Sequence, residues 1–256
     1  MQNNIFSGLF IGQNLLTLKE VDSTNTFLKN LLSNSKPLPE GTVIMAENQF
    51  AGRGQQQKKW FTEEGKNLTF SILLNPFFLN LKEQFRLTQV ISLGVAKAFQ
   101  NITGEGIKIK WPNDIYYNNK KLGGILIENL VQGQKINNSV IGIGLNINQV
   151  QFPDYLPQAI SLRQILHRDY DLRALLSDIC NYIEAGYLKL KTGRAADINE
   201  DYLSSLYGLN ELRQFSSNGE EFEGIITGVT AQGLLKILSQ NIEKQYNLKE
   251  VQFILN

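Results

Sequence analysis

The chain has 256 residues, which is enough for one sizeable hydrophobic core and a small second module. Its 25 Lys and Arg residues nearly balance its 24 Asp and Glu residues, so no overall basic field favours nucleic acid as a partner. No run approaches about 18 continuous apolar residues, and the N-terminus lacks the basic start of a signal peptide. The single cysteine, Cys180, excludes an intrachain disulfide and lies in a helical apolar pattern typical of a core residue. We therefore expect a cytoplasmic protein that binds neither membrane nor nucleic acid.

Strand and helix patterns alternate through the first half of the chain. The run Asp22 to Asn25 offers N-cap side chains, and an apolar stripe from Phe27 to Leu32 then predicts a helix. The segment Gly52 to Gly65 is polar and unusually long for a loop, which is typical of a segment that binds a ligand or is disordered. The other expected elements are strands at Leu15–Val21, Thr42–Ala46 and Leu68–Leu74 and a helix at Phe85–Phe99.

The second half begins with further strands. A polar hairpin turn is expected over Asn118–Lys121. A long amphipathic helix covers Leu172 to Ile183, and Asp197 is expected to cap a short last helix that stops near Gly208. The expected strands are Ile107–Trp111, Ile115–Tyr117, Leu122–Asn129 and Ser139–Ile147.

The helical period disappears after Gly208. Three short alternating segments follow, at Phe222–Thr227, Gly233–Leu238 and Gln245–Phe253, and turn residues separate them. This pattern suits a small SH3-like β-barrel. We therefore expect an α+β architecture, in which residues 1–207 form a mixed sheet with flanking helices and residues 208–256 form the β module.

Three short segments carry residues suited to an anionic ligand, although each also has an ordinary explanation. The first, Ala51 to Trp60, combines glycines that permit close backbone approach with the cations Arg53, Lys58 and Lys59. No Gly-Lys-Ser/Thr follows at the required spacing, so the segment is not a Walker A phosphate loop. Taken alone, it would suit a basic loop that only faces water.

The second segment joins Lys110-Trp-Pro-Asn-Asp114 to Lys121-Leu-Gly-Gly-Ile125. Glycines within an apolar strand indicate a bulge or a close backbone approach, and Lys121 would place a compact positive charge beside them. The alternative is a lysine-bearing turn whose charges face solvent. The third segment, Gly142 to Asn148, could line a nucleotide pocket or could simply pack closely.

His167 is the only histidine in the sequence. A histidine-based metal cluster and a Ser-His-Asp triad with a spare imidazole are therefore excluded as mechanisms. Its neighbours Arg168 and Asp169 indicate a position at the surface.

In combination the segments become specific. Their order is Asp22-Ser-Thr-Asn25, Gln49-Phe-Ala-Gly-Arg-Gly54 with Trp60, the lysine- and glycine-containing block from Lys110 to Ile125, and Gly144-Leu-Asn146. This order resembles the biotin protein ligases, and the block from Lys110 to Ile125 is its most specific part. The resemblance extends from about Leu15 to Phe253. It implies a catalytic domain like that of class II aminoacyl-tRNA synthetases, followed by the β module.

The resemblance also implies a reaction. The family makes biotinyl-5′-AMP from biotin and MgATP and then transfers biotin to a lysine of a biotin carboxyl carrier protein. Lys121 would bridge the biotin carboxyl and the phosphate, and Arg53 would lie in the loop that closes over both. Biotin contacts are implied for Ser23, Thr24, Asn25, Gln49, Gly52, Arg53, Gly54, Lys121, Gly124 and Ile125. ATP or adenylate contacts are implied for Arg53, Gln55, Lys58, Trp60, Asn113, Lys121 and Asn146, and a magnesium contact for Asp114.

Two features depart from patterns found in the family. Gln55 and Lys58 stand where the family loop often carries arginine, which removes a cation near the adenylate phosphate unless Lys58 or Lys59 compensates. Only 14 residues precede Leu15, too few for the winged helix with which some of these ligases repress transcription. We therefore expect a stand-alone ligase, monomeric or homodimeric, without a repressor role.

Two other functions fit parts of the pattern. A lipoate ligase or octanoyltransferase shares the general fold and also acylates a carrier lysine, but the block from Lys110 to Ile125 favours biotin. A non-catalytic module could retain a biotin-sized pocket, and the presence of Arg53 and Lys121 argues against it.

Overall fold

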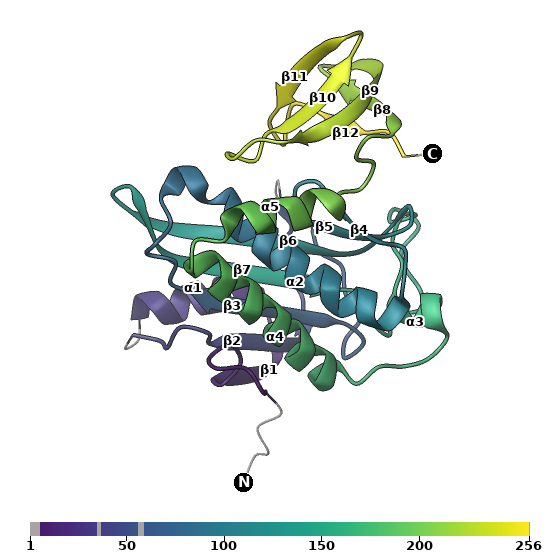
Figure 1. Cartoon of the computed structure of the whole chain (residues 1–256). Coiled ribbons are helices and arrows are strands. Elements are labelled where there is room, and N and C mark those ends of the chain that lie inside the picture. Colours follow the sequence, from purple (N-terminus) through teal and green to yellow (C-terminus); the bar gives the residue numbers. More distant parts are fainter. Residues whose placement is uncertain (1–5, 35–36, 56–58, 256) are drawn as a thin grey trace.

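The computed structural model describes residues 6–34, 37–55 and 59–255. Within these residues a seven-stranded mixed sheet carries helices on both faces, and the C-terminal residues form a separate five-stranded sheet above one end of it (Figure 1). The observed architecture is therefore the expected α+β arrangement with a terminal β module. No helix in the described part of the chain is long and apolar enough to cross a membrane.

The larger sheet has the strand order β1-β2-β3-β7-β6-β5-β4. Strands β1 and β2 pair in parallel because helix α1 returns the chain from the end of one to the start of the other. The remaining neighbours pair in antiparallel fashion. The bounds are β1 Leu15–Val21, α1 Thr24–Asn34, β2 Val43–Gln49, β3 Leu68–Leu74, β4 Ile107–Lys110, β5 Asp114–Tyr117, β6 Lys120–Gln132 and β7 Lys135–Leu145.

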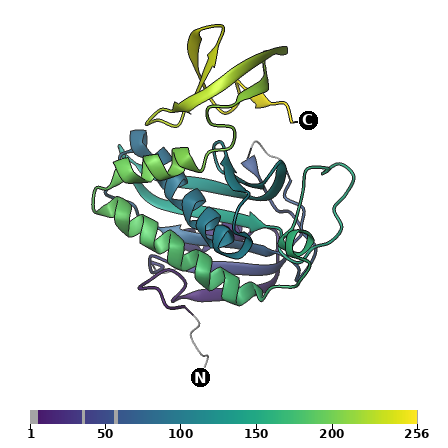
Figure 2. The same ribbon diagram turned by 45° about the vertical axis from the view of Figure 1, so that its right-hand side comes forward.

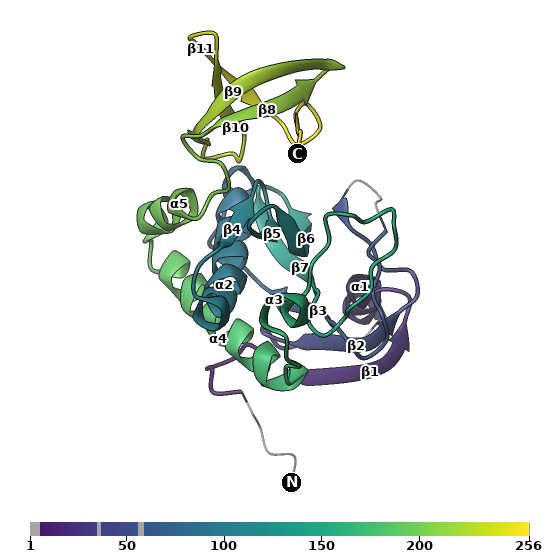
Figure 3. The ribbon, with the colours of Figure 1, turned by 90° about the vertical axis from the view of Figure 1, so that its right-hand side faces the viewer.

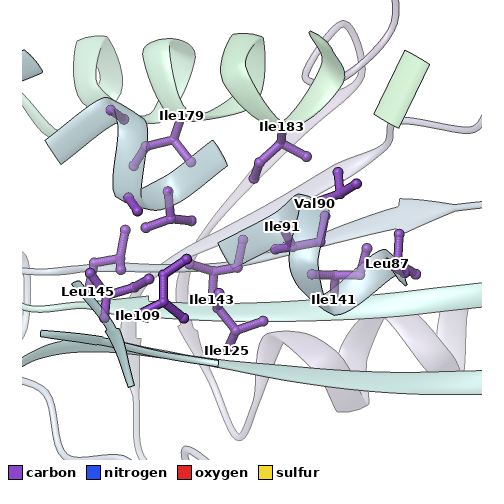
Figure 4. Close-up of a cluster of buried hydrophobic side chains, with 14 of the residues drawn as sticks. Leu87, Val90, Ile91, Ile109, Ile125, Ile141, Ile143, Leu145, Ile179 and Ile183 are labelled. Atoms are coloured by element: carbon purple, nitrogen blue, oxygen red, sulfur yellow. The ribbon is translucent and has the colours of Figure 1, made fainter. Parts of the chain in front are cut away.

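The main core lies between this sheet and three helices. Figure 3 shows α2 (Phe85–Thr103), α4 (Leu172–Lys191) and α5 (Ala195–Ser204) on one side of the sheet and α1 on the other. A Cβ atom at Gly94 of α2 would lie 2.7 Å from Cγ1 of Ile183, so glycine permits the close approach of α2 to α4. The side chains that fill this layer include Leu87, Val90, Ile91, Ile109, Ile125, Ile141, Ile143, Leu145, Ile179 and Ile183 (Figure 4).

Helix α1 covers the opposite face with a second, smaller core. Leu28 packs there with Ile44, Leu73 and Val140, one from each of β2, β3 and β7. Polar side chains gather on the same face of the sheet, beside the start of α1.

The C-terminal sheet has the order β11-β10-β9-β8-β12 and is antiparallel throughout. Figure 2 shows it, in light green and yellow, as a unit separate from the larger sheet. Two-residue turns join neighbouring strands at Asn218–Gly219 and Gln240–Asn241, and all four residues have positive φ, as type I′ hairpins require. Its core contains Phe215, Ile226, Leu235, Ile237 and Val251. The bounds are β8 Leu212–Ser217, β9 Glu220–Val229, β10 Leu235–Ser239, β11 Ile242–Tyr246 and β12 Gln252–Phe253.

Several sequence-based expectations need correction. Asp197 does not cap the last helix: α5 begins after Arg194, and Asp197 lies in its first turn, paired with that arginine. The hairpin turn contains only Asn118 and Asn119, so Lys121 belongs to strand β6.

The structure divides one predicted strand in two and contains three elements that the sequence did not predict. Residues 245–253 form the end of β11 and then β12, because Asn247 and Glu250 close a turn between them. Strand β8, the 3₁₀ helix η2 (Leu81–Glu83) and helix α3 (Leu162–Leu166) were not expected. The burial of Cys180 and the exposure of His167 confirm the predictions made for them.

Candidate active site

A cavity of about 750 Å³ opens on the face of the sheet that carries α1. Its wall combines the start of α1, the end of β2, the loop after β2, the β4–β5 turn, the first half of β6 and the end of β7. The loop that follows β7 contributes residues 152 and 155–159, and Figure 3 shows this loop on the same side as α1. Segments from three separate stretches of the described chain, within residues 23–61, 110–159 and 248–253, therefore meet at one site.

Most of the residues implied by the resemblance lie in this wall. Gly52 is not among the described residues that line the cavity; its carbonyl accepts a hydrogen bond from the Trp60 amide at 2.9 Å, so it supports the loop from behind. Lys58 lies outside the described residues. The implied residues that do line the cavity are Ser23, Thr24, Asn25, Gln49, Arg53, Gly54, Gln55, Trp60, Asn113, Asp114, Lys121, Gly124, Ile125 and Asn146.

A β-bulge brings Lys121 to the cavity. Ile115 pairs with Gly123 and Tyr116 pairs with Lys121, so Leu122 is an extra residue on β6. The extra residue changes the alternation of faces, and both Lys121 and Gly124 line the cavity while Leu122 is fully buried. The bulge expected from the paired glycines is therefore present.

The ammonium of Lys121 is held at a defined place. Its Nζ lies 2.8 Å from Oδ1 of Asp114 across the β5–β6 hairpin. A Cβ atom at Gly124 would lie 3.3 Å from the same Nζ. Because Gly124 has no side chain, a ligand can approach the ammonium directly over β6.

Buried hydrogen bonds fix the polar side chains at the start of α1. Oε1 of Gln49 accepts from the Thr24 amide at 2.8 Å. The Ser71 hydroxyl lies 2.7 Å from Oγ1 of Thr24 and 2.6 Å from Oδ1 of Asn25. Since all these groups are partly or fully buried, the network keeps this part of the wall in one arrangement before a ligand binds.

A charged cluster supports the same wall from strand β6. Glu128 accepts hydrogen bonds from Lys29 at 2.7 Å and from Asn25 at 2.8 Å, and Nη2 of Arg53 lies 3.4 Å from it. Partial burial acts to raise the pKa of the Glu128 carboxyl, but the hydrogen bonds and charges of these partners hold that pKa below its usual value. Glu128 is therefore an ionised group at the site.

Two asparagine side chains connect strands within the wall. The Asn113 amide donates to the carbonyl of Ile125, and the Asn146 amide donates to the carbonyl of Ile160 at 3.1 Å. Both residues are almost fully buried, at 2% and 4% exposure. Their donors therefore brace the β4–β5 turn and the loop after β7 against the centre of the sheet.

Two glycines of β7 make room for neighbouring side chains. A Cβ atom at Gly144 would lie 2.5 Å from Cε2 of Trp60, and one at Gly142 would lie 2.5 Å from Oδ1 of Asn25. The indole Nε1 of Trp60 is buried and has no hydrogen-bond partner among the described residues. Trp60 therefore packs against Gly144 and lines the cavity, and its buried N–H is paired with none of the described residues.

Comparison with known proteins identifies the family. The sequence model of the biotin/lipoate A/B protein ligase family matches residues 17–146, about half of the chain. The bifunctional ligase/repressor BirA of Bacillus spizizenii is 31% identical over 245 residues, which cover 91% of this chain and 74% of that protein. The chain belongs to the biotin/lipoate A/B protein ligase family.

A solved structure and a further sequence relative agree with this family membership. The biotin protein ligase of Aquifex aeolicus in complex with biotin and ATP superposes with a TM-score of 0.80 and 31% identity, over 95% of this ligase and all of that chain. The biotin–[acetyl-CoA-carboxylase] ligase of Paracoccus denitrificans is 32% identical over 132 residues, about half of each protein. The comparison with Aquifex aeolicus includes the terminal β module.

The β module of the ligase takes part in the cavity wall. Residues 248, 249 and 251–253 line it. The Trp111 indole donates to the carbonyl of Gly233 at 2.9 Å, and Nζ of Lys110 lies 4.7 Å from the centre of the Phe253 ring. The segment Lys110–Asp114 is therefore packed between the large sheet and the β module.

Sequence reasoning missed several of the ligase's site residues. Leu126 and Phe61 line the cavity, and Ser71 and Glu128 support it. Glu128 carried a readable signal, because it is a charge that directly follows the apolar run from Ile125 to Ile127. Ser71 carried none, since a serine within a buried strand is common.

Proposed function

We propose that this ligase activates biotin with ATP to give biotinyl-5′-AMP and pyrophosphate and then transfers biotin to a lysine of a biotin carboxyl carrier protein. One observation carries the proposal: Lys121 and Arg53 both line a cavity of about 750 Å³, with Gly124 leaving the Lys121 ammonium open to a ligand. Membership of the family and the likeness to a structure that holds biotin and ATP support it.

The chemistry explains why cations line the cavity. In the first step a biotin carboxylate oxygen attacks the α-phosphorus of ATP, and pyrophosphate leaves. In the second step the carrier lysine amine attacks the biotin acyl carbon, and AMP leaves. Both steps place negative charge on oxygens, which fixed cations stabilise in a site that excludes water. Lys121 is suited to bridge the two anions, and Arg53 is suited to hold the loop closed over them.

The start of α1 forms the biotin end of the proposed site. Ser23, Thr24, Asn25 and Gln49 supply polar groups for the ureido ring, and hydrogen bonds already hold the last three. Gly124 and Ile125 supply backbone and apolar contact. The backbone around Gly52 and Gly54 would close over the bound ring.

The opposite end suits the adenylate. Trp60 and Gln55 both line the cavity, and the buried Trp60 indole N–H is paired with none of the described residues. Asn113 and Asn146 brace the adjoining backbone and so shape this end, and Lys58 belongs to the same loop in the sequence. We assign these residues to ATP.

Magnesium would enter with ATP as part of the substrate. In the described part of the chain no group of three or more His, Cys, Asp or Glu residues could hold a metal. Mg²⁺ commonly uses one or two carboxylates together with substrate phosphates and water, so the single carboxylate of Asp114 fits that use. Asp114→Asn should then raise the Mg²⁺ concentration needed for half-maximal adenylation. A fall in kcat with an unchanged Mg²⁺ requirement would restrict Asp114 to positioning Lys121.

An adenylation assay tests the proposed function. The protein is incubated with ATP labelled in the α-phosphate and with biotin, and then with a carrier domain or the same domain with its target lysine changed to arginine. We expect labelled biotinyl-AMP, followed by biotin on the lysine-containing carrier only. Adenylation of lipoate but not biotin would contradict the proposal, as would binding of biotin without any adenylate.

We further propose that residues 1–207 and 208–256 are two domains, and that the ligase acts in the cytoplasm as a monomer or homodimer. Separate sheets on either side of Gly208 support the boundary. The buried Cys180 thiol is compatible with a reducing compartment. Light scattering would give the oligomeric state.

A further inference from the structure

The contacts of Glu128 divide its two oxygens between different partners. Oε1 pairs with Lys29 at 2.7 Å, whereas Oε2 accepts from Asn25 at 2.8 Å and lies 3.4 Å from Nη2 of Arg53. Asn25 and Arg53 line the cavity, but Lys29 and Glu128 are not among its described lining residues. The Glu128 carboxylate therefore affects the cavity only through its contacts with Asn25 and Arg53.

The distances indicate which cation neutralises the carboxylate. Lys29 lies closer than Arg53, and its side chain is less exposed, at 30% against 43%. Two cations and one carboxylate leave this cluster with one net positive charge. Glu128 can therefore orient Arg53 while the positive charge of Arg53 is not neutralised.

We propose that Glu128 positions Arg53 toward the cavity and that Lys29 neutralises Glu128, so that the Arg53 charge remains available to an anionic ligand. The inference rests on the proposed function, in which the ligand is the biotin carboxylate and then the adenylate phosphate. Lys29 and Glu128 are positioning residues in this arrangement, because neither reaches the reacting atoms.

The two charges should affect steady-state adenylation in different ways. Lys29→Met keeps a good helix former but leaves Glu128 to pair with Arg53, so the KM for biotin should rise about threefold with kcat nearly unchanged. Glu128→Gln removes the group that orients Arg53, so kcat should fall about tenfold without a rise in the KM for biotin.

The double variant supplies the sharpest test. In Lys29→Met/Glu128→Gln no carboxylate remains to capture Arg53, so the KM for biotin should return toward the wild-type value. The effect of Lys29→Met should also diminish at about 1 M KCl, where the screening length falls to about 3 Å. A purely structural tie between α1 and β6 would give neither result.

Lys236→Met and Glu243→Gln are matched controls, since that pair has the same 2.7 Å separation and lies in the β module. They should leave both kinetic constants unchanged. An unchanged KM in Lys29→Met, or equal and additive increases in both variants and their combination, would overturn the inference. Absence of biotinyl-AMP with the wild-type protein would instead overturn the proposed function.

Discussion

Lys121 and Asp114 form an ion pair of 2.8 Å across the β5–β6 hairpin, and the pair depends on the extra residue Leu122 in β6. Without the bulge, strand alternation would direct Lys121 and Gly124 to opposite faces of the sheet. With it, the ammonium lies above the glycine, at the edge of a cavity. The bulge at Leu122 therefore sets the face on which the proposed catalytic lysine lies, and Asp114 holds its ammonium there.

Lys121→Ala should abolish most biotinyl-AMP formation and leave the fold intact. The Lys121 side chain is about one-third exposed, so its removal leaves no buried cavity, but the developing phosphate charge loses its closest cation. Rates should fall by at least about a hundredfold. The neighbouring Lys120 is exposed, and Lys120→Ala serves as the control. A wild-type rate for Lys121→Ala would show that the catalytic lysine is misassigned.

Gln55→Arg should slow the release of biotinyl-AMP. Gln55 lines the cavity at a position where the family loop often has a cation, and an added guanidinium would attract the adenylate phosphate. We expect a release rate about three- to tenfold lower, as suits a partly exposed charge pair. Stopped-flow or filter-binding measurement of adenylate dissociation checks this, and an unchanged release rate would count against it.

Alanine substitutions at the two β7 glycines should each raise the KM for a different substrate. In Gly144→Ala the new Cβ would displace Trp60, so the KM for ATP should rise about tenfold, whereas Gly142→Ala would displace Asn25 and raise the KM for biotin. Each variant is the control for the other because both lie in one strand. Equal effects on both substrates would contradict the assignment of the two ends of the cavity.

Glu184→Ala should destabilise the fold without a direct effect on the site. The Glu184 carboxylate is 5% exposed and accepts from the amides of Leu9, Phe10 and Ile11 at 2.5–2.8 Å. Leaving these donors unpaired should cost about 3 kcal/mol in the free energy of unfolding, measured in urea. Asp178→Ala, an exposed change on the same helix, should have little effect. A loss below about 0.5 kcal/mol for Glu184→Ala would refute this role.

Lowering the pH should reduce the free energy of unfolding of the wild-type protein more than that of the Glu128→Gln variant. Because the pKa of Glu128 in the fold lies below its unfolded value, its contribution is present above that unfolded value and is lost as pH falls through the folded value. The difference in the free energy of unfolding between the two proteins should therefore be largest at neutral pH and shrink as the pH falls through the folded pKa of Glu128. Parallel pH profiles would contradict the prediction.

Much of the sheet could be predicted because apolar alternation and turn residues agree. Strands β1 and β3 have the predicted bounds, and the helices α2 and α4 follow clear apolar stripes. The far ends of β6 and β7 were missed because residues 130–138 are largely polar and are stabilised by pairing with each other. Pairing between polar residues across a hairpin leaves no periodic signal in the sequence.

Local capping explains two of the other differences. Helix α3 carries a readable signal, since Ser161 and Gln164 form a capping box, but five residues are too few for an apolar period. Asp197 has a good N-cap side chain, yet the helix starts earlier and uses the carboxylate in its first turn. At the site, the residue types were predictable from motif order, whereas the partnership of Lys29 with Glu128 required the fold.

Strand β6 carries Lys121, Gly124 and Glu128 within eight positions, and their shared face depends on one bulge. A single-residue insertion or deletion between Lys121 and Glu128 would reverse the faces on one side of it. The hairpin end at Gln132 to Lys135 lies beyond this register and does not line the cavity. Length changes, such as a short labelling peptide, should therefore be accepted at Gly133 and rejected a few residues earlier in the same strand.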